Sequence, residues 1–241
     1  MKWIGGGLGW AFAGPIGAMM GFAIGSMFDN ASVMEYRRAG TNLKDHSTTS
    51  GDFGISLLIL AGAVMKADGK VLNSELEYVK RFFNQQFGVQ DTQERMLLFR
   101  ELLKQETDVA EVCAQIKSNM SLHARLQMLH FLFGISRSDS HVHEKEVAMI
   151  ERIARYLGIR EGDFLSLKAM FYKDAGAAYR ILETDQQATD EELKKAYRKM
   201  ALKYHPDKLA HLGEEFQKSA KEKFQKLNAA YETIKKERGL K

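Results

Sequence analysis

Apolar residues recur about every 3.6 positions between Gly54 and Tyr172, and no convincing run in this region alternates as a half-buried strand would. Such a pattern buries one stripe of each helix, so it predicts an all-α protein. With 241 residues, the chain can hold one large or two modest domains of roughly 100–200 residues each. We expect helices over residues 55–67, 73–88, 121–135, 144–157 and 162–172, with two more starting at Asp91 and Asp108.

Two stretches of this helical region repeat each other, DGKVLNSELEYV from Asp68 and DSHVHEKEVAMI from Asp139. Asp68 matches Asp139, and Glu75 matches Glu146. Each stretch follows an apolar helix and opens another one. The repeat therefore predicts a duplicated helix-turn-helix, packed about a pseudo-twofold axis within a helical bundle over residues 53–172.

The N-terminal region contains no charged residue from Trp3 to Phe28. At ~1.5 Å per residue, this run is long enough to cross the ~30 Å hydrocarbon core of a membrane. We expect a transmembrane anchor within residues 1–30. Two alternatives remain open. One is a signal peptide with a cleavage site at Ala11-Phe12-Ala13, and the other is a hairpin, because Pro15 and many glycines weaken a single helix.

Three glycines of the apolar segment, Gly17, Gly21 and Gly25, lie at four-residue intervals. This spacing clears one helix face so that a second helix can approach closely, which predicts a homodimer through the segment. More basic residues follow the segment closely than precede it. The positive-inside bias then predicts a single pass with the C-terminal bulk in the cytoplasm, after a polar juxtamembrane linker over residues 31–52.

The C-terminal region combines a basic helix, a turn and a second long helix. Thr189 and Glu192 form a capping box at the start of the basic helix, and Pro206 stops it. The turn presented there is His205-Pro206-Asp207-Lys208. The second helix carries one apolar stripe, made of Phe216, Ala220, Phe224, Leu227, Tyr231 and Ile234. Two antiparallel helices closed by a short third one are predicted over residues 174–241.

Composition and motifs argue against several classes of function. The only cysteine, Cys113, cannot form an internal disulfide, and we expect it to be buried and apolar in role. His205 and Asp207 have no Ser or Cys nucleophile motif or glycine-rich phosphate loop beside them, so we do not expect an enzyme. The net charge is only +4, and Glu191 and Glu192 dilute the basic helix, so we expect no nucleic-acid partner.

The paired DG-x-V-x-x-x-E turns resemble the TerB-like, tellurite-resistance family of helical domains, although Ser140 replaces the second glycine. The resemblance implies a metal site with Asp68, Glu75, Asp139 and Glu146 as ligands, together with His141 or His143. The residues alone have a simpler explanation. Aspartate at a turn caps the next helix, and glutamate in a first turn favours the helix dipole, so no cofactor is required.

The C-terminal region resembles the J-domain family through A-Y-R-x-L at residues 178–182, the basic helix, HPDK, and F-x-x-L-N-x-A-Y at residues 224–231. The resemblance implies a DnaK-class chaperone as partner, whose ATP hydrolysis the domain stimulates. The implied contacts are the turn His205, Pro206 and Asp207 and the helix residues Lys194, Tyr197, Arg198 and Lys199, with Lys203 peripheral.

The whole architecture resembles the DjlA family of bacterial, membrane-anchored, DnaJ-like co-chaperones. This implies a protein of the inner membrane that delivers clients to its chaperone. A stress or tellurite response carried by the TerB-like part, with the J domain as recruiter, is the alternative. The sequence departs from the family pattern because no long Gly/Gln-rich linker precedes the J domain, which predicts closer coupling of the two domains.

Overall fold

The computed structural model describes residues 14–24, 51–139, 143–172, 176–205, 207 and 214–240, and all the regular structure among them is helical. A helical stretch covers residues 14–24. The helices that follow are α2 (Gly51–Met65), α3 (Asn73–Leu103), α4 (Val109–Asn119), α5 (Leu122–Ile135), α6 (Glu144–Tyr156), α7 (Glu161–Phe171), α8 (Ala177–Ile181), α9 (Asp190–Lys203) and α10 (Glu214–Glu237). The predicted all-α class is confirmed.

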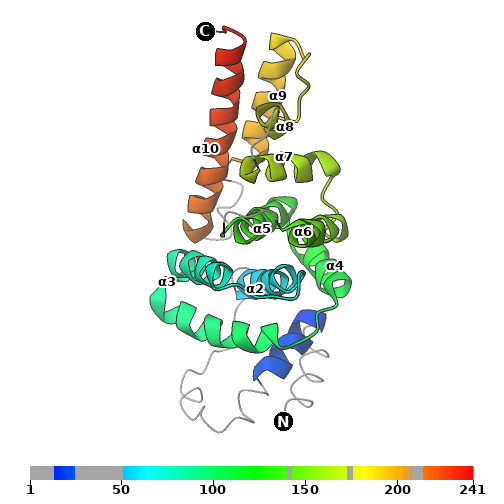
Figure 1. The fold of residues 1–241 in the computed structure, drawn as a ribbon, viewed down its shortest axis with the longest axis vertical. Coiled ribbons are helices and arrows are strands. Elements are labelled where there is room, and N and C mark those ends of the chain that lie inside the picture. Colours follow the sequence, from blue (N-terminus) through cyan, green and yellow to red (C-terminus); the bar gives the residue numbers. More distant parts are fainter. Residues whose placement is uncertain are drawn as a thin grey trace.

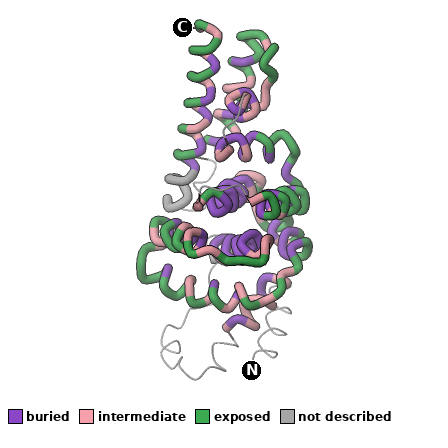
Figure 2. Tube along the Cα trace, in the orientation of Figure 1, coloured by how far each residue is buried: buried purple, intermediate pink, exposed green. Residues whose placement is uncertain are grey.

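Helices α2 and α5 form the centre of the first domain, and their residues are buried along almost their whole lengths (Figure 1, Figure 2). Both helices are apolar on nearly every side, so they are stable only when other helices cover them. The neighbours α3, α4, α6 and α7 provide that cover. Leu58 and Leu60 of α2 and Leu129 and Phe133 of α5 are almost wholly buried.

The helix α5 comes very close to α3 at Gly134. A Cβ atom added there would fall well inside the contact distance of the Tyr78 hydroxyl oxygen and ring. The Tyr78 ring also lies 6.0 Å from the ring of Phe131, which helps to hold it in place. Only glycine therefore fits at position 134 with α3 in this position.

The helix α3 turns sharply at Gly88, whose φ is 80° and ψ is 168° (Figure 1). Few residues other than glycine adopt this conformation, which explains why the first helical stretch stops there as expected. The second stretch starts directly after Gly88, ahead of the predicted start at Asp91. The Thr92 hydroxyl donates a hydrogen bond of 2.6 Å to the Gly88 carbonyl and helps to secure the new first turn.

The second domain is the predicted helical hairpin. Helices α9 and α10 run antiparallel with α8 beside them (Figure 1). The capping box is present: Glu192 N–H donates to Thr189 Oγ1 over 3.3 Å, and Thr189 N–H donates to Glu192 Oε2 over 2.8 Å. Leu193 and Met200 of α9 and Leu227 of α10 are buried between the helices.

The two domains pack directly against each other. Helix α8 lies on α7, and α10 extends past the hairpin to contact α3 (Figure 1). This arrangement agrees with the close coupling expected from the missing linker. Asp174, within the proposed domain start, lies outside the described residues.

Residues 14–24 lie against α4 and the connection between α3 and α4. The Ile16 N–H donates to Gln115 Oε1 over 3.0 Å, and Gln105 Nε2 donates to the Met19 carbonyl over 3.3 Å. Among the described residues, no helix has both the length and the apolar character needed to cross a membrane. Most of the expected anchor, including Gly25, lies outside the described residues.

Candidate functional site

The turn that follows α9 projects polar side chains from the end of the hairpin. The side chain of Asp207 is 87% exposed, and that of His205 is 47% exposed. The Asp207 N–H donates to Nδ1 of His205 over 3.4 Å. The His205 ring meets the Phe224 ring edge-on, with 5.9 Å between centroids. His205 therefore organises the turn and Asp207 faces outward, while Pro206 lies outside the described residues.

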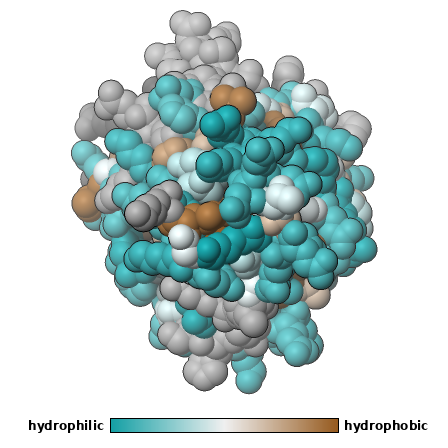
Figure 3. All heavy atoms as spheres, turned by 90° about the horizontal axis from the view of Figure 1, so that it is seen from above, coloured by the Kyte–Doolittle hydropathy of each residue, from teal (hydrophilic) through white to brown (hydrophobic). Residues whose placement is uncertain are grey.

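The exposed face of α9 is basic. Lys194, Arg198 and Lys199 are all exposed. Hydrophilic side chains also cover most of the end of the molecule at which the C-terminus lies (Figure 3). Tyr197 is half-buried because its ring stacks on Tyr231 at 4.2 Å between centroids. Such a face can form charge-assisted hydrogen bonds with an acidic partner surface.

The structure places Lys203 differently from the expected peripheral partner contact. Its side chain is only 12% exposed, and Nζ forms ion pairs with Asp163 of α7 and, at 2.9 Å, with Glu183. Lys203 faces the first domain because it lies in the last turn of α9, where the hairpin meets α7. The spacing of residues along the sequence gave no signal that Asp163 or Glu183 would be its partners.

The acidic turns of the two repeats meet on the first domain. Ligand atoms of Asp68, His143 and Glu146 all lie within 4.8 Å of one another. Nε2 of His143 lies 2.8 Å from Asp139 Oδ2, and the Leu72 N–H donates to Glu75 Oε2 over 2.7 Å. Four predicted ligands and one of the two predicted histidines are thus neighbours. His141 lies outside the described residues.

Two glutamates of this acidic cluster are buried. Burial raises the pKa of Glu75 to about 6 and, together with the charge of Glu75, raises that of Glu146 to about 7. Glu75 Oε1 and Glu146 Oε2 have no hydrogen-bond partner among the described residues. A cation held by Asp68, His143 and Glu146 would satisfy the Glu146 oxygen, so this donor set fits a metal ion that prefers carboxylate and imidazole ligands.

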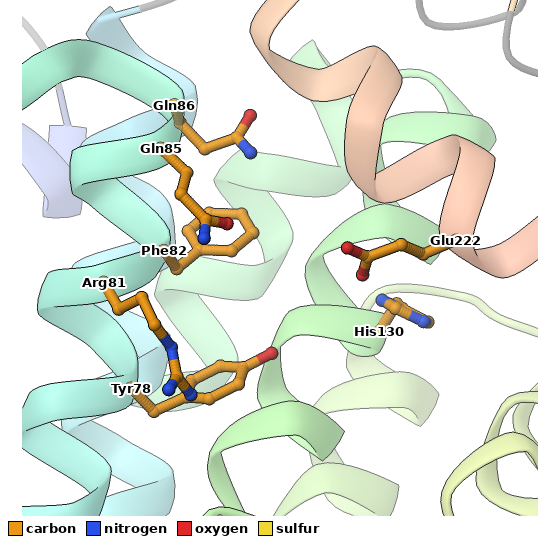
Figure 4. Close-up of a pocket in the computed structure, with 7 residues that line it drawn as sticks. All are labelled: Tyr78, Arg81, Phe82, Gln85, Gln86, His130 and Glu222. Atoms are coloured by element: carbon orange, nitrogen blue, oxygen red, sulfur yellow. The ribbon is translucent and has the colours of Figure 1, made fainter.

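Other titratable groups serve packing rather than chemistry. Burial raises the pKa of the Cys113 thiol to about 12, which makes it inert, as expected for a buried apolar role. His130 is buried against Phe171, with 4.8 Å between ring centroids, and burial lowers its pKa. It borders a cleft of about 230 Å³ between α3, α5 and α10 (Figure 4). The lining residues are Tyr78, Arg81, Phe82, Gln85, Gln86, His130 and Glu222.

Three protein-family models match successive parts of the chain. They are the co-chaperone DjlA transmembrane domain at residues 1–41, tellurite resistance protein TerB at 55–169, and the DnaJ domain at 177–239. Co-chaperone protein DjlA of Photobacterium profundum is 27% identical over 276 residues, which cover 100% of this chain and 99% of that protein.

Two further relatives support the same organisation. Co-chaperone protein DjlA of Coxiella burnetii is 26% identical, over 99% of this chain and 98% of its own. Chaperone protein DnaJ of Fusobacterium nucleatum is 46% identical over 56 residues, which are 23% of this chain and 14% of that protein. No solved structure matches the chain.

The three family matches leave few residues unassigned, and the relatives named DjlA match over the full length of the chain. A J domain implies a DnaK-class chaperone as partner, and the N-terminal match implies anchoring in a membrane. The chain therefore belongs to the DjlA family of co-chaperones, which are J-domain proteins without enzymatic activity of their own.

Proposed function

We propose that this membrane-anchored co-chaperone stimulates ATP hydrolysis by a DnaK-class chaperone and so brings clients and chaperone together at the membrane. The supporting observation is the exposed turn at His205 and Asp207, which continues the basic face of α9. The test is the steady-state ATPase rate of a purified DnaK-class chaperone with and without the full chain. An unchanged rate at saturating chain would refute the proposal.

The proposed chaperone contacts are the three residues of the turn and the face of α9. Lys194, Arg198 and Lys199 provide positive charge that steers an acidic partner surface into contact. Tyr197 fixes the spacing of α9 and α10, because its hydroxyl donates to Asn228 Oδ1 over 3.0 Å. Lys203 is omitted because its charge is already paired inside the protein.

We further propose an orientation at the bacterial inner membrane with both folded domains in the cytoplasm. The domain boundaries that go with it are an anchor at 1–30, a linker at 31–52, the TerB-like domain at 53–172 and the J domain at 174–241. Protease added to inverted membrane vesicles should cut first within 31–52 and release the folded part. Cleavage within 31–52 in intact spheroplasts instead would show the opposite orientation.

The glycines of the anchor are proposed to form a dimer contact. Replacing Gly17 and Gly21 by leucine should weaken crosslinking between two copies of the chain, because bulky side chains keep the helices apart. Membrane retention should stay the same, since leucine is more apolar than glycine. The dimer contact would be contradicted if the variant formed as much crosslinked dimer in membranes as the original chain does.

A second proposed function is cation binding by the TerB-like domain, as in a stress or tellurite response. It is favoured by the buried Glu146 Oε2, which has no hydrogen-bond partner among the described residues and whose residue belongs to the group of possible ligands. A pseudo-twofold arrangement of the repeats explains why equivalent residues, Asp68 with Asp139 and Glu75 with Glu146, meet in one cluster. Asp68, Glu146 and His143 would hold the ion.

Calorimetric titration of the chain with Mn²⁺, Zn²⁺ or Ca²⁺ tests this second function. One ion should bind per chain, and Glu146→Gln should weaken binding about tenfold or more, because a carboxylate ligand and its charge are lost. The matched control is Glu144→Gln, an exposed glutamate at the start of the same helix. Equal binding by both variants, or no binding to the original chain, would exclude the site.

A further inference from the structure

Lys203 lies two positions before His205 and is held by a residue of the TerB domain. Its ammonium group sits between the carboxylates of Asp163 and Glu183, and Asp163 is completely buried, with 0% of its side chain exposed. Asp163 belongs to α7 of the TerB domain, whereas Lys203 ends α9 of the J domain. An ion pair between the two domains thus lies two positions along the chain from His205.

The ion pair is part of a small network in which Asp163 has two cationic partners and Glu183 has three. Arg160 Nε lies 3.2 Å from Asp163 Oδ2, and Arg160 Nη2 lies 3.7 Å from Glu183 Oε2. Lys199 Nζ lies 3.5 Å from the same oxygen of Glu183. Removing one partner of a buried pair is strongly destabilising, because it leaves a charge buried and uncompensated. Replacing Asp163 by a neutral residue in the docked chain would remove one of the two carboxylate partners of Lys203 in this way.

Contacts on either side of the network complete the junction between the domains. The Ser166 hydroxyl of α7 donates to the Ile181 carbonyl of α8 over 2.8 Å. Nζ of Lys226 on α10 lies 3.8 Å from the centre of the Phe171 ring. The His205 ring borders a small cavity that is also lined by His123 and Leu126 of α5. The recruiting turn is therefore supported by two helices of the TerB domain.

We propose that the TerB domain positions the recruiting turn, and that Asp163 is the positioning residue, acting through Lys203. The docked arrangement leaves Asp207 and the basic face of α9 exposed, so it presents the turn rather than covering it. A turn held in its binding orientation loses less freedom when the chaperone binds. This inference rests on the proposed stimulation of a DnaK-class ATPase.

The test replaces Asp163, because Asp163 belongs to the TerB domain and lies outside the proposed chaperone contacts. In the full chain, Asp163→Asn should raise the concentration that gives half-maximal ATPase stimulation about fivefold, because the apparent affinity falls with the fraction of chains in the competent arrangement. The maximal stimulation should stay the same, since His205 and Asp207 are intact. A merely unstable variant would show a lower melting temperature and loss of active protein instead.

Two further variants sharpen the ATPase result. Arg160→Gln removes an arginine that is 62% exposed and pairs with both carboxylates, so it should raise the half-maximal concentration without unfolding the chain. Glu161→Gln, an exposed acid in the same turn as Asp163, is the matched control and should behave as the original chain. The proposal would be overturned if Asp163→Asn and Arg160→Gln both gave half-maximal ATPase stimulation at the same concentration as the original chain.

A measurement of domain docking separates this inference from the proposed function. Spin labels at Glu151→Cys on α6 and Lys236→Cys on α10 report the distance between the domains, and the inert Cys113 thiol stays unlabelled. We expect a narrow distance distribution that Asp163→Asn broadens. A broad distribution in the original chain, or a narrow one in both, would refute positioning by Asp163. If neither the original chain nor any variant stimulated the ATPase, while the original chain kept a narrow distribution of distances between the spin labels, the proposed ATPase function would be refuted instead.

Discussion

Replacing His205 by glutamine should reduce the ATPase rate of a DnaK-class chaperone in the presence of this chain to its unstimulated value. The imidazole holds the turn by accepting a hydrogen bond from the Asp207 N–H and by packing edge-on against the Phe224 ring. Glutamine can provide a polar atom but not a rigid ring, so Asp207 loses its orientation. The ATPase assay with saturating chain measures the effect.

The variant should remain folded, because His205 is close to half exposed and surface substitutions of this kind change stability by about 0.5 kcal/mol or less. Circular dichroism melting checks this. Lys236→Gln, an exposed change in the last turn of α10, is the control and should stimulate normally. Full stimulation by His205→Gln would remove this residue from the mechanism.

The variant Gly134→Ala should lose about 1–3 kcal/mol of stability, since overpacking a close-packed core has an effect of this size. The added methyl group collides with the hydroxyl and ring of Tyr78. Moving the ring would disturb its contacts with Phe131 and with the guanidinium of Arg81. The expected result is a lower melting temperature of the TerB domain.

The same substitution at Gly162 provides the matched control. Gly162 lies in α7, where a new Cβ would meet only the Glu183 side chain at 3.7 Å, an ordinary contact. Alanine is favoured over glycine in a helix by up to about 1 kcal/mol, so Gly162→Ala should keep or raise the melting temperature. Equal losses at both positions would show that Gly134 has no special packing role.

Local signals in the sequence predicted most of the helices and their ends. The Asp108 side chain accepts hydrogen bonds from the backbone of the first turn of α4, as its position before an apolar stripe indicated. The Thr189 capping box and the stop at Gly88 depend on residues only a few positions apart. Such features are predictable because the interacting groups are fixed by the backbone geometry of one turn.

Contacts between distant segments were predicted where the sequence repeats and where α9 and α10 bury their apolar stripes. The repeat places Glu75 and Glu146 at equivalent positions, and the structure brings them into one cluster. The ion pair of Asp163 with Lys203 has no such signature, because it depends on how two domains are oriented. Lys203 looks like its basic neighbours along α9, and only its place in the last turn makes it face inward.

The helix α10 contacts both α3 of the TerB domain and the other helices of the J domain. A J domain on a flexible tether explores a volume that grows with tether length, and its local concentration near any one point falls accordingly. Here the rigid helix replaces such a tether. The chaperone would then be received at one fixed distance and angle from the TerB domain.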